Sequence, residues 1–159
     1  MKKGILLVGL LGLMVSGSLS LAATTASHTI SVKVPAYIRI SITKVVDATN
    51  NTVNDQKLVY NVQDSDISDT GLINKQIGAA TVAVITNSTG GARVTTALND
   101  AVELKPLLYT GATGLDGYNF TTSKGSQSVV VPYTLKGDLS SLVPNQTYQT
   151  TVTYTAAAQ

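Results

Sequence analysis

The feature that most constrains the fold of this chain is a strict alternation of apolar and polar residues near its N-terminal end. Every second residue from Ile30 to Ile42 is apolar, and the residues between them are mostly polar. A period of two places the apolar side chains on one face of an extended chain, which a helix cannot do. Pro35 falls on the opposite face and has no N–H to donate, so it either divides the run into two short strands or marks a sheet edge. The alternation therefore predicts β-strand over residues 30–42.

The rest of the chain shows similar patterns in short pieces separated by turn residues. Alternating or apolar runs predict further strands at residues 57–62, 80–86, 92–98, 103–109, 127–136 and 147–156. Residues 47–56 and 110–117 are rich in turn-forming residues, and residues 63–78 form the longest polar connection. The Asn-Ser-Thr-Gly-Gly run at residues 87–91 predicts a β-hairpin loop.

These patterns together predict an all-β protein of about eight strands. Strands of ordinary length with turn signals between them are typical of a single antiparallel β-sandwich, immunoglobulin-like in the broad sense. A jelly roll or a small barrel has a similar number of strands and stays the alternative. Because the chain contains no cysteine, its stability is expected to come from sheet pairing and an aliphatic core.

The first 22 residues predict an export signal that is cleaved. Lys2 and Lys3 precede an apolar run at residues 5–15, which has the length of a signal-peptide apolar region and is too short to span a bilayer. Small residues ending at Ala22 suit a cleavage site, although a buried core helix is the alternative interpretation of this run. The sandwich would then occupy residues 23–159. We expect the protein at the cell surface or outside the cell, after passage through the periplasm where the cell has an outer membrane.

The charge balance after cleavage limits the partners that this chain is expected to bind. Without the two leader lysines, nine basic residues face nine acidic ones, so the expected mature chain is formally neutral. Net charge therefore predicts no attraction to nucleic acid and none to anionic membranes. No membrane span is expected after signal cleavage. The expected partners are copies of the same chain or other surface proteins.

The ionisable residues predict no enzyme and at most one metal site. His28 is the only histidine and lies close to the expected mature N-terminus, which is a poor platform for a catalytic triad. Asp64, Asp66 and Asp69 form the one acidic cluster, and their carboxylates are the kind of oxygen ligand that Ca²⁺ prefers. Calcium is thus the one candidate cofactor. The alternative interpretation is a solvated acidic loop.

The two ends of the chain show patterns found in a known class of exported proteins. Residues 29–36 alternate directly after the expected leader, and residues 144–155 form a tyrosine-containing closing strand. In these features the chain resembles the secreted β-sandwich subunits of bacterial surface fibres, of the pilin and spore coat protein U type. It departs from them in lacking a cysteine near the first strand and in extending by residues 156–159 beyond the closing strand. The resemblance implies a structural or adhesive fimbrial protein.

The resemblance also implies assembly by strand donation, in which the N-terminal extension of one subunit fills a groove in the next by β-augmentation. Residues 24–34 would be the donor, with Ile30, Val32 and Val34 as the side chains that fill pockets. The alternative is that this segment is the first strand of its own domain. The uninterrupted alternation across Pro35 favours this alternative.

A second function stays open beside the fibre subunit. The chain would then be a monomeric extracellular module that binds glycan or another surface protein through loops at residues 63–78 and 110–119, where Tyr109 and Tyr118 are the nearest aromatic residues. N-x-Ser/Thr sequences that permit glycosylation occur at Asn50, Asn87, Asn119 and Asn145.

Overall fold

The structure is a computed structural model that describes residues 29–99 and 102–159. The chain divides into two units, residues 1–33 and 34–159. The predicted leader, its cleavage site and His28 lie outside the described residues. Residues 29–33 of the first unit have no regular secondary structure.

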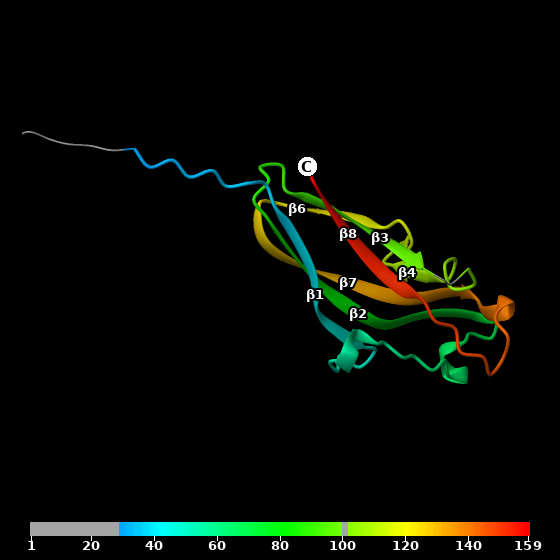
Figure 1. Ribbon diagram of the computed structural model, residues 1–159. Coiled ribbons are helices and arrows are strands. Elements are labelled where there is room, and N and C mark those ends of the chain that lie inside the picture. The colour runs from blue at the N-terminus through cyan, green and yellow to red at the C-terminus, as the bar shows by residue number, and fades with distance from the viewer. Residues whose placement is uncertain (1–28, 100–101) are drawn as a thin grey trace, which may run out of the picture. The chain divides into compact units, whose positions relative to one another are not determined.

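The second unit contains the strands, which form two antiparallel sheets (Figure 1). The strands are β1 (Ile38–Asp47), β2 (Leu72–Thr86), β3 (Ala92–Asn99), β4 (Leu108–Thr110), β5 (Thr113–Gly114), β6 (Asn119–Thr122), β7 (Gly125–Asp138) and β8 (Thr151–Ala158). One sheet has the order β1-β2-β7-β4-β5, and the other has the order β6-β3-β8. Short 3₁₀ turns lie at Asn54–Gln56, Asp64–Asp66 and Leu139–Ser141. The prediction of an all-β sandwich of about eight strands is confirmed.

The strand order is that of an immunoglobulin sandwich with one place empty. Constant-type immunoglobulin domains have strands A to G in the sheets ABED and CFG. Here β1, β2, β7 and β4 take the places of A, B, E and D, while β3 and β8 take the places of C and F. The short strands β5 and β6 are additions to this pattern. Because β8 is the last strand, nothing in the described part of the chain takes the place of strand G beside it.

The core lies between the two sheets and is formed by alternate residues of their strands. Along β3, buried and exposed residues alternate strictly over the whole strand. Val82 and Val84 on β2 and Val94 on β3 are inaccessible to solvent. β2 is paired on both edges, with β1 and β7, so its apolar residues suit a central strand. The prediction of a central strand at residues 80–86 is confirmed.

The first strand begins later than the alternation predicts. Residues 29–37 form no strand, and β1 starts at Ile38. Alternation determines which side chains share a face, but a strand also needs a hydrogen-bonded neighbour. The ladder between β1 and β2 starts at the pair Ile38 and Thr86, where β2 ends. The favoured interpretation of residues 24–34 as the first strand of their own domain is therefore wrong for residues 29–34, the described part of this segment.

Other observed strand boundaries also differ from the predicted ones. Residues 57–62 form no strand, and most of residues 103–109 are turn, with β4 starting only at Leu108. The predicted polar connection at residues 63–78 ends at Gly71, because Leu72 already pairs with Asp138 of β7. In each case the local pattern was compatible with a strand or a loop, and pairing with a distant strand decided between them.

The predicted hairpin loop at residues 87–91 connects the two sheets instead. It leads from β2 in the larger sheet to β3 in the smaller one, and these two strands do not pair. Gly91 has a φ of 82° there, a conformation that glycine adopts readily. In the described ranges 29–99 and 102–159, we find no helix with the length and apolar character needed to span a membrane.

Candidate assembly interface

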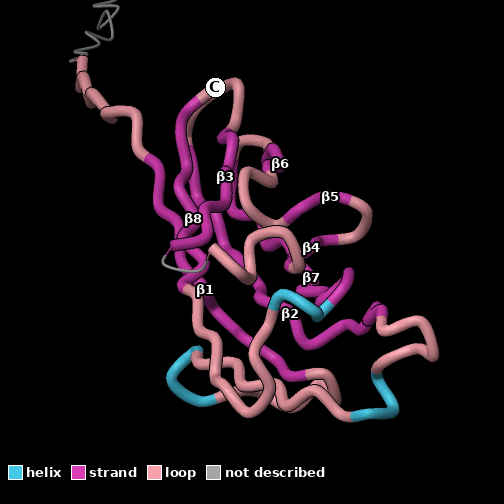
Figure 2. Tube along the Cα trace, turned by 90° about the vertical axis from the view of Figure 1, so that its right-hand side faces the viewer, coloured by secondary structure: helices cyan, strands magenta, loops and turns pink. Residues whose placement is uncertain are grey.

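β1 and β8 lie side by side, each at the edge of its sheet (Figures 1 and 2). β1 pairs only with β2, and β8 pairs only with β3. No ladder joins β1 to β8 in the described part of the second unit. One backbone edge of each strand therefore has no ladder partner in the described part of the chain. We call the boundary between these two unpaired edges the open seam, and it lies where an immunoglobulin sandwich has strand G.

The inward-facing apolar side chains along this seam are only half-buried. They pack against the core but keep part of their surface exposed: Ile38, Ile40 and Ile42 on β1, and Val152, Tyr154 and Ala156 on β8. The corresponding side chains of the flanked strands, such as Val84 and Val94, are fully buried. The apolar core is therefore incompletely covered along the seam, and covering it would be favourable by about 25 cal/mol per Å² of apolar surface.

The open stretch of β1 is its N-terminal half. Near the C-terminal end of the strand, the Val53 N–H donates to the Val45 carbonyl at 2.8 Å, and the Gln56 side chain donates to the Ile42 carbonyl at 3.2 Å. Since backbone groups alternate sides along a strand, the N–H and C=O of Ile38 and Ile40 also point to this edge. No partner for them is found among the described residues. Apart from the Ile42 carbonyl, which is bonded to Gln56, residues 38–42 thus leave an open edge of about 17 Å.

The predicted donor residues are exposed and belong to no strand. Ile30, Val32 and Val34 have exposed fractions of 76%, 80% and 67%. Their spacing at every second residue equals that of the inward-facing residues of the open stretch, residues 38–42. The remaining donor residues, 24–28, lie outside the described part of the chain.

Asn87 binds the backbone just before β1, a contact that the sequence did not predict. Its Oδ1 accepts from the Tyr37 N–H at 2.8 Å, and its Nδ2 donates to the Pro35 carbonyl at 2.8 Å. Thr86 Oγ1 donates to the Tyr37 carbonyl at 3.2 Å. The carboxamide of Asn87 thus acts as one more peptide group beyond the last ladder pair. Its partners are about fifty residues away, so no local pattern could have revealed this contact.

The same loop also binds the end of β8. Ser88 Oγ donates to the Gln159 carbonyl at 2.6 Å, and the Gln159 N–H donates to the Gly91 carbonyl at 3.1 Å. Residues 87–91 therefore hold the start of β1 and the end of β8, which are the two edges of the seam at this end of the sandwich.

Asp66, the central residue of the predicted calcium site, is bonded within the protein. Its carboxylate accepts from the Tyr60 hydroxyl at 2.5 Å and from the Gln63 N–H at 3.0 Å, and it pairs with Lys75 Nζ at 2.9 Å. The hydrogen bond from Tyr60, followed by that from Lys75, lowers the pKa of Asp66 to about 2. Burial and the Asp66 carboxylate raise the pKa of Tyr60 to about 12. These bonds attach the long 48–71 connection to β2.

The three predicted calcium ligands differ in their surroundings. Asp64 and Asp69 are exposed, whereas the Asp66 side chain is only 4% exposed. No group of three or more His, Cys, Asp or Glu side chains suited to a metal occurs in the parts of the chain that are described. Calcium binding at Asp64, Asp66 and Asp69 stays an untested prediction, and it would have to compete with Lys75 for the Asp66 carboxylate.

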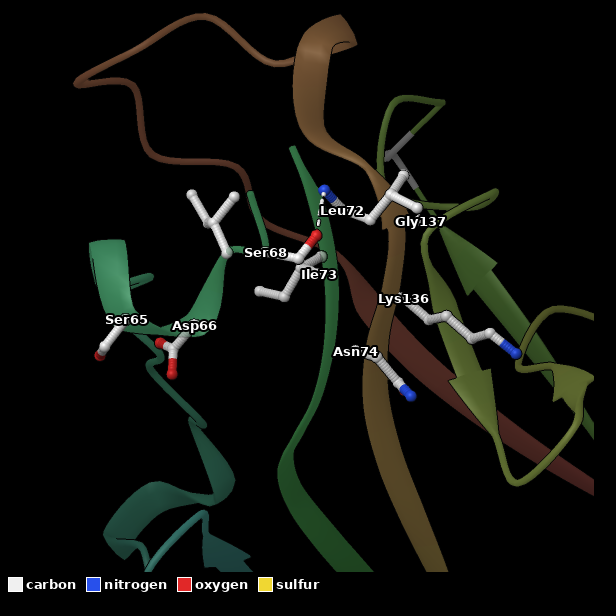
Figure 3. Close-up of a pocket in the computed structure, with 9 residues that line it drawn as sticks. Ser65, Asp66, Ser68, Leu72, Ile73, Asn74, Lys136 and Gly137 are labelled. Carbon is white, nitrogen blue, oxygen red and sulfur yellow. Dashed lines mark hydrogen bonds between the residues drawn. The ribbon is translucent and has the colours of Figure 1, made fainter. Parts of the chain in front are cut away.

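A shallow hollow lies beside Asp66, between the start of β2 and the end of β7 (Figure 3). Asp66 and Lys136 lie on opposite sides of this hollow and point away from each other. Lys136 Nζ lies 5.6 Å from the ring centre of Tyr109, and Asp66 is paired with Lys75. The charged groups at the hollow therefore have partners elsewhere and do not converge on a ligand.

The loops predicted for a binding module are partly strands. Leu72 to Gly78 belong to β2, and the second loop contains β5 and the first residue of β6. Tyr118 packs against the core, with its ring centre 6.1 Å from that of Phe120. Tyr109 and Tyr118 therefore contact the protein itself, through Lys136 and Phe120.

Within the second unit, the candidate interface thus consists of the open seam and the contacts of Asn87 at the start of β1. Most of the exposed alternating residues 29–34 belong to the first unit. A comparison of the chain with protein-family models found no match, and a comparison with curated proteins found none either.

Proposed function

We propose that this chain is an exported structural or adhesive subunit of a cell-surface or extracellular assembly, and that it polymerises by β-strand donation. The observation that supports this most is the open seam between β1 and β8. It combines an unpaired edge over residues 38–42 with half-buried apolar side chains, and the chain carries an exposed segment with matching alternation at residues 30–34.

In the proposed contact, residues 29–34 of one copy lie in the seam of the next. The free backbone groups of Ile38 and Ile40 gain ladder hydrogen bonds, and the apolar side chains of the donor cover the half-buried row of the acceptor. Full burial of an Ile or Val side chain is worth about 1.5–3 kcal/mol, against the cost of ordering the donor. Because donor and acceptor are different surfaces, the contact is head-to-tail, and it generates an open filament when the rotation between neighbouring copies does not close into a ring.

Export is part of this proposal and rests on the predicted leader at residues 1–22. A chain without cysteine depends on its sheets for stability outside the cell. A donor segment directly behind the leader would be freed for assembly when the leader is cleaved. The proposed role needs no catalytic turnover.

Size-exclusion chromatography with light scattering tests the proposal. Two versions of the chain are compared, one starting at Ala23 and one starting at Ala36. We expect the longer version to form ladders or filaments and the shorter one to stay monomeric. A longer version that remains a stable monomer, with a shorter one that unfolds, would overturn strand donation and direct the search to ligands of the loops.

A further inference from the structure

The donor segment could bind in either of two places, the open seam of its own subunit or that of a neighbouring copy. Residues 29–34 are joined to β1 by three residues, so their own seam is always close by. Such a tethered contact has an effective concentration in the millimolar range. At micromolar protein concentration, closure onto the same subunit would therefore prevent polymerisation unless a feature of the chain opposes it.

Side chains alternate between the two faces of a strand, and this restricts which residues of the donor segment can pair with β1 of the same subunit. With the shortest loop that brings the two apolar faces together, Val34 pairs with Ile38 and Val32 pairs with Ile40. Such pairing leaves residues 35–37 as a three-residue loop. A loop longer by two residues would have to take Ile38 out of its ladder with β2. A loop of two residues would shift the register by one and turn Val32 and Val34 to solvent.

A three-residue loop has a defined geometry that uses the Tyr37 N–H. Its first part is a type I turn in which the N–H of the last loop residue donates to the carbonyl before the loop, here that of Val34. Pro35 suits the first position of this turn. Tyr37 would take the left-handed conformation, which is unfavourable for a tyrosine and which Tyr37 does not have in the structure.

In the structure this N–H is already bonded to Asn87. Oδ1 of Asn87 accepts it at 2.8 Å, while Nδ2 of Asn87 binds the Pro35 carbonyl at 2.8 Å. A carbonyl and the N–H two residues later point to the same side only when the chain between them is extended. The Asn87 contact and the closing turn therefore exclude each other.

We propose that Asn87 is a positioning residue that holds residues 35–37 extended and so prevents the donor segment from closing onto its own subunit. This role rests on the proposed strand donation and explains why the partner is a second copy of the chain. Each hydrogen bond of Asn87 shifts the balance between donation and closure by about tenfold, since a net hydrogen bond of this size corresponds to roughly that ratio.

The absence of cysteine allows closure to be trapped directly. The substitutions Val32→Cys and Ile40→Cys are made together in the full chain, because within one subunit these positions are opposite each other only when the segment closes. A disulfide between two copies is counted with the polymer. Cross-strand neighbours lie within disulfide distance. Oxidised protein at micromolar concentration is analysed by non-reducing electrophoresis with mass spectrometry for the internal disulfide, and by light scattering for polymer.

The double cysteine chain is compared with the same chain carrying Asn87→Ala, Asn87→Asp or the control Asn119→Ala on the exposed face of β6. We expect polymer with Asn87 and with the control. Asn87→Ala should raise the ratio of internal disulfide to polymer at least tenfold. Asn87→Asp keeps the acceptor for the Tyr37 N–H and should give an intermediate ratio.

A further variant, Tyr37→Gly, leaves Asn87 in place but removes the cost of the left-handed conformation. It should also increase the internal disulfide. It therefore measures the balance between closure onto the same subunit and donation to a second copy even if Asn87→Ala fails to fold. If polymer forms equally in all variants with no gain of internal disulfide, the role of Asn87 is wrong and strand donation stands. If neither polymer nor internal disulfide forms in any variant, the proposed function is wrong as well.

Discussion

The hydroxyl oxygens of Tyr133 on β7 and Tyr154 on β8 lie 2.8 Å apart and join the two sheets across the core. Burial raises the pKa of both tyrosines. Both hydroxyls therefore stay protonated at neutral pH, so that one can donate to the other. The bond lies next to the seam, since Tyr154 is one of the half-buried residues of β8.

Removing one of these hydroxyls should destabilise the sandwich. Tyr154→Phe leaves the Tyr133 hydroxyl without its partner in a buried site, which costs about 1–3 kcal/mol. Urea unfolding followed by circular dichroism measures the loss, and Tyr37→Phe at an exposed position serves as the control. The double variant Tyr133→Phe with Tyr154→Phe should cost less than the sum of the single variants. Additive losses would show that the two hydroxyls do not interact.

A charge on the apolar face of the donor segment should abolish polymerisation. Val32→Asp would place a carboxylate in the apolar seam, which is costly without a partner. Ser31→Asp puts the same charge on the opposite face of the segment and should leave polymerisation intact. Light scattering at matched concentration compares the two variants. Equal polymerisation of both would show that this face does not enter a seam.

Asp66 should make the sandwich sensitive to acid in a defined window. Its pKa is lowered from 3.8 to about 2. A lowered pKa in the folded state stabilises the protein above the unfolded value, and this contribution is lost as the pH falls from about 4 towards about 2. Thermal unfolding between pH 1.5 and 7 should show this loss in the parent chain.

Asp66→Asn should be less stable than the parent at neutral pH and should lack this part of the pH dependence. Asp64→Asn, at an exposed neighbouring position, is the matched control and should follow the parent. A parallel pH profile for the parent and Asp66→Asn would contradict the role assigned to the Tyr60 and Lys75 bonds.

Gly91 should not tolerate a side chain. It has a φ of 82°, and a Cβ atom there would overlap the Thr122 carbonyl oxygen. Gly111 has a φ of 60° but open space where its Cβ would lie. Gly111→Ala should therefore lose only about 1–2 kcal/mol of stability, the cost of a left-handed backbone conformation in a residue other than glycine. Gly91→Ala should lower the free energy of unfolding in urea clearly more than Gly111→Ala does. Equal losses would show that residues 87–91 can move away from the added Cβ atom without a cost in stability.

Much of the strand content could be predicted because it depends on near neighbours in the sequence. The alternation in β3 and β7 predicted both strands to within a few residues. The apolar run of β2 predicted its central position. These properties need no knowledge of what a strand pairs with, since the period of two is a property of the extended chain itself.

Alternation alone did not predict correctly where the first strand begins. Residues 29–37 alternate as regularly as Ile38 to Ile42, yet only the latter form a strand, because β2 ends at Thr86 and offers no further partner. Residues 57–62 likewise look like a strand but are attached by the bond between Tyr60 and Asp66 instead of by a ladder.

The sequence by itself determined the all-β class, the absence of disulfides and the apolar face of residues 30–42, because composition and period are local quantities. Only the tertiary structure decided that β1 and β8 leave a seam open and that Asn87 holds the backbone beside it. Both depend on contacts between residues about fifty or more positions apart. Such contacts are selected by the packing of whole sheets, which no local pattern records.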